Sequence, residues 1–120
     1  MAKSILIADD NDIVRSIIRF FLETEGFEVC GEAADGVDAI EKAKQLKPDL
    51  IVLDLAMPRM NGVEAASALK GMMPDVPLIC FTMYKELMGH SLTAAVGVDA
   101  VLSKPDGVSG LVECVQSLLN

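Results

Sequence analysis

The sequence is poor in cysteine and histidine, which limits the kinds of site it can build. Its three cysteines, Cys30, Cys80 and Cys114, lie far apart and form no CxxC pair, and His90 is the single histidine. An odd number of widely spaced cysteines argues against a disulfide framework, and the lack of paired Cys and His ligands argues against a zinc site. We therefore interpret the cysteines as small apolar residues in or near a core, and we expect a reducing, cytoplasmic environment.

Positive charge is also scarce. The chain has 10 Lys and Arg residues against 18 Asp and Glu residues, so its formal net charge is −8. Such a charge repels nucleic-acid phosphates and anionic lipids, so direct binding to nucleic acid or membrane is not expected, and a cation is the more natural ligand. The sequence contains neither an apolar stretch of the roughly 18 residues that a membrane span needs nor the apolar segment of a signal peptide.

Buried strand material, by contrast, is abundant. With 120 residues, of which 52% are hydrophobic, the chain suits one domain, residues 1–120, around a single core. Five strand-like apolar runs occur, and most are continuous rather than alternating, as in parallel strands that are covered on both faces. The expected strands are residues 4–8, 27–32, 49–54, 77–82 and 99–103.

Helical patterns separate these runs. The first apolar stripe consists of Ile13, Val14, Ile17, Ile18 and Phe21. The other stripes lie within residues 37–46, 63–69 and 108–119, and residues 85–96 carry the weakest pattern. This alternation predicts an α/β fold, a doubly wound (βα)5 arrangement with helices on both faces of a parallel sheet. In such folds, ligands bind beyond the carboxyl ends of the strands.

Polar residues stand where four of the strands end. The run "ILIADDND" places Asp9 and Asp10 after the first strand, Asp54 ends the third, and Thr82 and Lys104 close the fourth and fifth. Because the carboxyl ends of parallel strands share one edge, we expect these five side chains to converge. Crowded carboxylates repel one another unless a cation binds between them, and Mg²⁺ prefers such oxygen ligands. The sequence therefore predicts a site for Mg²⁺, or Mn²⁺, at this edge.

A carboxylate beside a divalent cation can also be a nucleophile toward phosphorus, because the metal neutralises the charge of the transferred group. Asp54 is the expected nucleophile, since it leaves the central and most apolar strand. Lys104 would pair with a phosphoryl oxygen as a point charge, and the Thr82 hydroxyl would donate to another.

At this point the sequence resembles the receiver domains of two-component response regulators. The motifs that carry the resemblance are "LIADDND", "PDLIVLDLAMPRMNG", "FTM" and "LSKP", which stand in the family's order and span essentially the whole chain. The resemblance implies a flavodoxin-like fold with strand order 2-1-3-4-5. It also implies that Asp9 or Asp10, Asp54 and the backbone carbonyl of Ala56 hold Mg²⁺. Asp54 would accept its phosphoryl group from a sensor histidine kinase or a histidine phosphotransfer protein.

The stretch "VCGEAADGVDAI" is most similar to receivers that usually carry a C-terminal helix-turn-helix domain of the LuxR type. The resemblance leaves two forms open, a stand-alone receiver that acts on a downstream effector, or a receiver whose output domain follows Asn120. Dimerisation that depends on phosphorylation is a further expectation from the family.

Other features depart from the family pattern or refine it. Receivers commonly have an aromatic residue three positions before the lysine, where this chain has Val101, and its only tyrosine, Tyr84, lies close to the fourth strand. The resemblance also suggests a cis bond between Lys104 and Pro105. In the loop after the third strand, the methionines expected to be exposed and to face a partner are Met57 and Met60.

Two alternative functions use the same residue types. "DNDIV" fits the signature of haloacid-dehalogenase-type phosphatases, with Asp10 as nucleophile and Asp12 as acid-base, but it leaves Asp54 without a role and lacks the further acidic pair that such enzymes need. A flavin-binding module on the same fold would need a Ser/Thr/Gly phosphate loop and stacking aromatics, whereas this loop is acidic and aromatics make up 4% of the chain.

Overall fold

The structure, a computed structural model, describes residues 2–60, 62–83 and 96–120. Five parallel strands form one sheet in the order β2-β1-β3-β4-β5, which confirms the predicted order. The strands are β1 (Ser4–Ala8), β2 (Glu28–Ala33), β3 (Leu50–Leu53), β4 (Leu78–Thr82) and β5 (Ala100–Ser103). Each strand begins and ends within one residue of its predicted bounds, because continuous apolar runs between polar residues mark strand ends clearly.

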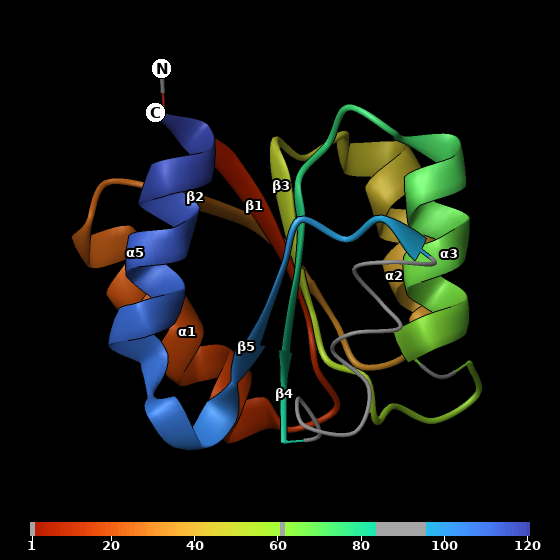
Figure 1. The fold of residues 1–120 in the computed structure, drawn as a ribbon, viewed down its shortest axis with the longest axis horizontal. Coiled ribbons are helices and arrows are strands. Elements are labelled where there is room, and N and C mark those ends of the chain that lie inside the picture. The colour runs from red at the N-terminus through yellow and green to blue at the C-terminus, as the bar shows by residue number, and fades with distance from the viewer. Residues whose placement is uncertain (1, 61, 84–95) are drawn as a thin grey trace.

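Helices cover both faces of the sheet, as a doubly wound fold requires. The α-helices of the described residues are α1 (Asp12–Thr24), α2 (Gly36–Leu46), α3 (Gly62–Met72) and α5 (Val108–Leu119). Figure 1 shows α1 and α5 together on one face and α2 and α3 on the other. The helix expected within residues 85–96 lies outside the described residues. None of the described helices is long and apolar enough to cross a membrane.

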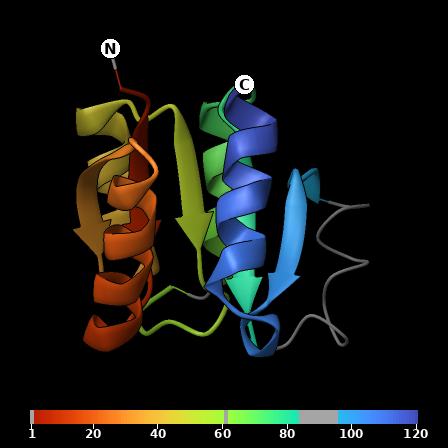
Figure 2. The ribbon, with the colours of Figure 1, turned by 90° about the vertical axis from the view of Figure 1, so that its left-hand side faces the viewer.

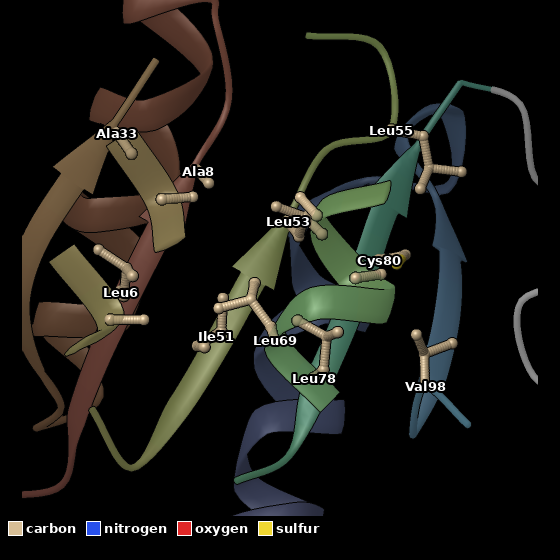
Figure 3. Close-up of a cluster of buried hydrophobic side chains, with 14 of the residues drawn as sticks. Leu6, Ala8, Ala33, Ile51, Leu53, Leu55, Leu69, Leu78, Cys80 and Val98 are labelled. Carbon is tan, nitrogen blue, oxygen red and sulfur yellow. The ribbon is translucent and has the colours of Figure 1, made fainter. Parts of the chain in front are cut away.

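The strands bury alternate residues under the two helix layers. In β3, Leu50 and Val52 pack toward α1 and α5, whereas Ile51 and Leu53 pack toward α2 and α3. Figure 3 shows the second layer, in which Leu69 of α3 lies over side chains of β3 and β4. Burial on both faces explains why the strand sequences are continuously apolar.

The apolar stripe of α1 was predicted with the wrong orientation. The helix buries Ile18 and Leu22 against the sheet. By contrast, Ile13 is 71% exposed and Phe21 is 43% exposed, although both belong to the predicted stripe. The helix is apolar around much of its circumference, so its periodicity alone does not specify which side meets the core.

The strand ends and the chain termini occupy opposite edges of the sheet. Figures 1 and 2 show all strands running toward one edge, with both termini at the other. At the carboxyl edge, Asn11 begins α1 by accepting hydrogen bonds from the backbone of Ile13 and Val14, at 2.9 and 3.1 Å. Asp35 begins α2 in the same way, through Asp38 N at 2.8 Å. These caps turn the chain sharply from strand to helix beside the predicted site.

Candidate functional site

Two buried carboxylates stand at the carboxyl ends of the central strands. Asp9 follows β1, and its backbone N–H donates to Ala33 O of β2 at 2.9 Å. Asp54 follows β3, and its backbone N–H donates to Ala8 O at 2.8 Å. The sheet hydrogen bonding therefore extends into the site and fixes both backbones. The two residues are only 2% and 5% exposed, respectively, while the neighbouring Asp10 is exposed.

Lys104 joins the two carboxylates. Its Nζ lies 2.7 Å from Asp9 Oδ2 and 3.4 Å from Asp54 Oδ2. The side chain is only 16% exposed, so these ion pairs are less screened than surface pairs. The predicted convergence of the strand-end groups is thus seen directly for these three residues.

The bond between Lys104 and Pro105 is trans, so the expected cis bond is wrong; no cis peptide occurs among the described residues. Trans is the favoured form of X-Pro bonds, and Pro105 lies in a short 3-10 helix, Lys104–Asp106, whose backbone its fixed φ suits. Lys104 reaches both acids from this trans backbone.

The charges of the site do not balance. Burial and the nearby charge of Asp9 raise the pKa of Asp54 above its usual value, although Lys104 and the N–H groups of Ala56 and Leu55 act to lower it. Burial alone would lower the pKa of Lys104, but its hydrogen bond to Asp9 and the charge of Asp54 raise it overall. One ammonium group therefore stays charged, yet does not offset the carboxylates around it.

The acidic group fits a divalent cation. Carboxylate oxygens of Asp9, Asp10 and Asp54 lie within 4.8 Å of one another. Asp9 Oδ1 accepts the N–H of Asn11 and Asp54 Oδ1 accepts that of Leu55, which orients the two carboxylates. Oxygen ligands of this kind, with one exposed to solvent, suit Mg²⁺, which keeps several of its waters. Ala56, whose carbonyl is the fourth expected ligand, lies two residues beyond Asp54 at an exposed position.

Thr82 lies at the same edge, fully buried at the end of β4. It pairs in register with Ser103 of β5, the residue before Lys104. Val101, which replaces the family's usual aromatic residue, is 8% exposed and packs in the core beside α2 and α3. Tyr84 and His90 lie outside the described residues.

The loop after Asp54 differs from the expectation. Met57 is only 8% exposed and Met60 is half-buried, so the prediction that both are exposed is wrong, while contact with a partner stays a prediction. Both pack against the core cluster on the α2 and α3 side, because the loop folds back over this face. Apolar side chains of a loop are not necessarily surface anchors when the loop lies against a core.

Sequence reasoning missed Arg15 of α1. Its Nη1 donates to the backbone O of Asp9, its Nη2 pairs with Asp12, and its Nε donates to Glu32 Oε1 of β2 at 2.9 Å. The guanidinium therefore ties the acidic turn between β1 and α1 to Glu32 of β2. The only signal in the sequence was a basic residue one turn into an otherwise apolar helix, which is usually a solvated position.

Comparison with known proteins identifies relatives of this arrangement. The family model "Response regulator receiver domain" matches residues 5–116. The response regulator protein VraR of Staphylococcus epidermidis is 39% identical over 117 residues, which is 97% of this chain and 56% of VraR. The chemotaxis protein CheY of Thermotoga maritima is 34% identical over 119 residues, 98% of each chain. This chain therefore spans about half the length of VraR and nearly all of CheY.

A solved structure shows the same fold over its full length. The DNA-binding response regulator of the LuxR family from Staphylococcus aureus superposes with a TM-score of 0.90 at 25% identity, covering 98% of this chain and 99% of that one. The phosphatase alternative has no support in these similarities. Its nucleophile would be the exposed Asp10, whereas the structure centres the buried group on Asp9, Asp54 and Lys104.

Proposed function

The chain belongs to the response regulator receiver domain family of two-component signalling, and we propose that residues 1–120 form a receiver that accepts a phosphoryl group on Asp54. The observation that carries this proposal is the position of Asp54. Like Asp9, it is buried beside Lys104 and belongs to the three-acid group that fits a cation. Its Oδ2, however, lies 3.4 Å from Lys104 Nζ, whereas Asp9 Oδ2 lies at 2.7 Å, so Asp54 has the oxygen that is held less tightly.

Asp54 has the chemistry of an acceptor. A carboxylate oxygen bonds to phosphorus while the bond from phosphorus to its donor breaks, and the electron pair leaves with the donor group, which takes up a proton. The other oxygen, Oδ1, is held by the N–H of Leu55 at 2.8 Å. The hydrogen bond thus fixes the carboxylate, and the transfer converts a crowded carboxylate into an acyl phosphate.

The metal ligands of the proposal are Asp9, Asp10, Asp54 and the backbone carbonyl of Ala56, with Mg²⁺ or Mn²⁺ as the cation. Bound there, the cation would neutralise charge on the carboxylates and on the phosphoryl oxygens. The buried Asp9 has its orientation set by Asn11 and Lys104, whereas the exposed Asp10 is free to adjust to the ion. One fixed and one adjustable carboxylate suit a cation that retains waters.

Lys104 and Thr82 complete the proposed site. Lys104 bonds to both acids before transfer, so it can exchange its contact with Asp54 for a phosphoryl oxygen without leaving the pocket. The Thr82 hydroxyl, at the end of the adjacent strand, would donate to a second phosphoryl oxygen. Its movement would carry the signal toward β4 and β5, since the buried Val101 offers no aromatic ring to swing outward.

The proposed phosphoryl donor is a sensor histidine kinase or a histidine phosphotransfer protein in the cytoplasm. The output would pass to a separate effector or to an output domain of a longer protein, as the LuxR-family structural relative suggests, and phosphorylation could drive dimerisation. This chain carries a net charge of −8, so we assign it no contact with nucleic acid or membrane.

The test uses acetyl phosphate as a small phosphoryl donor with Mg²⁺ and intact-mass spectrometry as the readout. Wild type should gain one phosphoryl group, and Asp54→Asn should gain none. Asp10→Asn should label slowly but still at Asp54, because it loses a metal ligand rather than the acceptor. Undiminished labelling of Asp54→Asn would reject Asp54, and loss of labelling in Asp10→Asn with the phosphoryl group mapped to Asp10 in wild type would revive the phosphatase reading.

A further inference from the structure

The loop that follows Asp54 is held at both ends by neighbouring helices. We define the Asp54 loop as residues 55–60. At its start, Gly62 at the beginning of α3 donates its N–H to Leu55 O at 2.8 Å. A Cβ on Gly62 would lie 2.3 Å from Asp54 O and from Leu55 Cα, so only glycine allows this approach. The helix therefore fixes the loop directly beside the acceptor.

The far end of the loop is held by an ion pair to α2. Arg59 donates from Nε to Asp35 Oδ2 at 3.0 Å and from Nη2 to Asp35 Oδ1 at 2.9 Å. Two parallel bonds between a guanidinium and a carboxylate fix direction as well as distance. Asp35 is itself fixed, because its Oδ1 also accepts the N–H of Asp38 as the cap of α2. The hydrogen bond from Arg59 and that from Asp38 lower the pKa of Asp35, so the pair stays charged.

The backbone around Arg59 is built for this contact. Arg59 has a φ of 64°, a left-handed conformation that is uncommon for a residue other than glycine. The next residue, Met60, lies against Gly36 so closely that a Cβ there would be 2.5 Å from Met60 O. A left-handed backbone costs free energy in a residue other than glycine, so other contacts must offset that cost. The two hydrogen bonds from Arg59 to Asp35 are contacts of this kind.

Ala56 lies between these two fixed points. Its N–H acts to lower the pKa of the Asp54 carboxylate, and its carbonyl is the backbone ligand in the proposed metal site. Met57, the next residue, is buried in the core cluster, so the short segment around Ala56 has little freedom once Leu55 and Arg59 are held. The contact that Arg59 makes with Asp35 is thus one of the points that hold the segment around Ala56.

We infer that the Arg59–Asp35 ion pair is a positioning device that holds the Asp54 loop in its metal-binding shape, so that breaking the pair weakens Mg²⁺ binding. This inference rests on the proposed function of Asp54. Arg59 and Asp35 both lie outside the acidic group of Asp9, Asp10 and Asp54. The affinity of that group for Mg²⁺ would therefore depend on a contact at the start of α2.

The sign of one substitution separates positioning from simple charge. Arg59→Gln removes a positive charge from a strongly acidic protein, so electrostatics alone would make Mg²⁺ bind more tightly. Loss of positioning predicts the opposite, an affinity weaker by about threefold, because the Arg59 side chain is 59% exposed and an exposed ion pair contributes little. The two explanations therefore cannot give the same result.

The experiment measures the Mg²⁺ dissociation constant by calorimetry for wild type, Arg59→Gln, Asp35→Asn and the double variant. Asp35→Asn keeps a capping oxygen for α2 while it removes the charge of the pair. Each single variant should weaken binding by about threefold, and the double variant should be no weaker than either, because both remove one contact. The matched control is Asp38→Asn, which removes the same charge near the start of the same helix and breaks the pair with Lys42, but keeps both hydrogen bonds between Arg59 and Asp35.

A second readout does not involve the metal. Amide chemical shifts of Leu55, Ala56 and Gly62, recorded without Mg²⁺, should move in Arg59→Gln and Asp35→Asn and stay in place in Asp38→Asn. Arg59→Gln that binds Mg²⁺ as tightly as wild type, or additive losses in the double variant, would overturn the inference, as would unmoved amides. If wild type itself binds no Mg²⁺, the proposed function fails, and the amide shifts still report whether the pair positions the loop.

Discussion

Two clusters of charged side chains near the carboxyl edge of the sheet have opposite charges at their centres. In the Glu32 cluster, one acid lies between two cations, with Arg15 Nε at 2.9 Å and Arg19 Nε at 2.7 Å from its carboxylate oxygens. In the acidic site, one cation lies between two acids, with Lys104 Nζ at 2.7 Å from Asp9 and 3.4 Å from Asp54. A third acid, Asp10, increases the excess of negative charge in the acidic site.

The pKa shifts of the central acids differ accordingly. Burial by itself would raise the pKa of Glu32, but the hydrogen bonds from Arg19 and Arg15 lower it overall. Burial and Asp9 raise the pKa of Asp54 despite Lys104. The chain thus neutralises Glu32 with its own cations, whereas it leaves Asp54 with too little positive charge. A structural ion cluster is complete by itself, whereas the proposed site for a metal and a phosphoryl group would be completed by its ligands.

The largest predicted effect is the loss of stability when the Glu32 cluster is broken. Glu32→Gln should lower the free energy of unfolding by about 2 kcal/mol, because it leaves two partly buried guanidinium groups without their shared carboxylate; the value is below that for fully buried pairs, since Glu32 keeps some exposure. Urea denaturation followed by circular dichroism measures it, since the chain has no tryptophan.

The control for this prediction is Glu23→Gln. Glu23 also pairs with Arg19, at 3.3 Å, but its side chain is 48% exposed. An exposed pair within one helix contributes at most about 0.5 kcal/mol, so this variant should be close to wild type. Equal losses in the two variants would mean that the Glu32 cluster is no more than a set of surface pairs.

The second prediction concerns the acidic site, in which bound Mg²⁺ would supply the missing positive charge. Mg²⁺ at ten times its dissociation constant should stabilise wild type by about 1.4 kcal/mol, because the ion binds the folded acidic group and not the unfolded chain. The double variant Asp9→Ala, Asp10→Ala should lose this gain, while Glu32→Gln should keep it. Denaturation with and without Mg²⁺ provides the measurement, and an equal gain in the double variant would place the ion elsewhere.

The third prediction is that a substitution at a buried residue, which usually destabilises a protein, stabilises this one. Without metal, Asp54→Asn should stabilise the protein by about 1 kcal/mol, since it removes a charge that burial and Asp9 disfavour and functional sites commonly cost stability on this scale. In saturating Mg²⁺ the order should invert, because wild type alone retains this ligand.

Asp99→Asn is the matched control for that reversal. Asp99 stands at the other end of the sheet, where its Oδ2 accepts the N–H of Leu78 at 2.8 Å and pairs with Lys70 at 3.1 Å. Its charge is well compensated, so the same chemical change should destabilise the protein or leave it unaltered. Stabilisation by both variants would point to a general relief of the negative net charge rather than to a special state of Asp54.

The sequence sufficed for the acidic site because sheet topology brings its residues together. The parallel (βα)5 arrangement follows from the alternation of apolar runs and helices, and every parallel strand delivers its following residue to one edge. The strand order, which places β1 beside β3, came from the family resemblance. Together they place Asp9, Asp54 and Lys104 at the same edge. Their contacts with one another needed no knowledge of loops.

Features that depend on loop conformation and on helix rotation could not be predicted from the sequence. Arg59 and Asp35 belong to different loops, and their pairing depends on a left-handed backbone at Arg59 that no residue type announces. The same limit applies to Met57, which was expected at the surface and is buried. For α1, a helix that is apolar on several sides can pack in more than one rotation, and only the partner surfaces decide that Ile18 is buried while Ile13 is exposed.

The smallest predicted effect is the pH dependence of the two clusters, because protonation can at most remove the differences described above. The pKa of Glu32 is lower in the folded protein than its usual 4.5, so its stabilisation is complete above pH 4.5 and is lost as the pH falls through the folded pKa. The pKa of Asp54 is raised above its usual 3.8, so its destabilisation is complete above the folded pKa and disappears as the pH falls from there to 3.8.

Acid therefore moves the two clusters in opposite directions. On lowering the pH without metal, the advantage of wild type over Glu32→Gln should shrink, and so should the advantage of Asp54→Asn over wild type. The directions of the two pKa shifts fix the sign of each change, because Glu32 protonates below its usual pKa of 4.5 and Asp54 protonates above its usual 3.8. Urea denaturation of the three proteins between pH 7 and pH 3 tests both signs. If the advantage of wild type over Glu32→Gln does not shrink in acid, the Arg15 and Arg19 pairs do not hold Glu32 ionised as the structure indicates, and the contrast between a complete and an incomplete cluster fails.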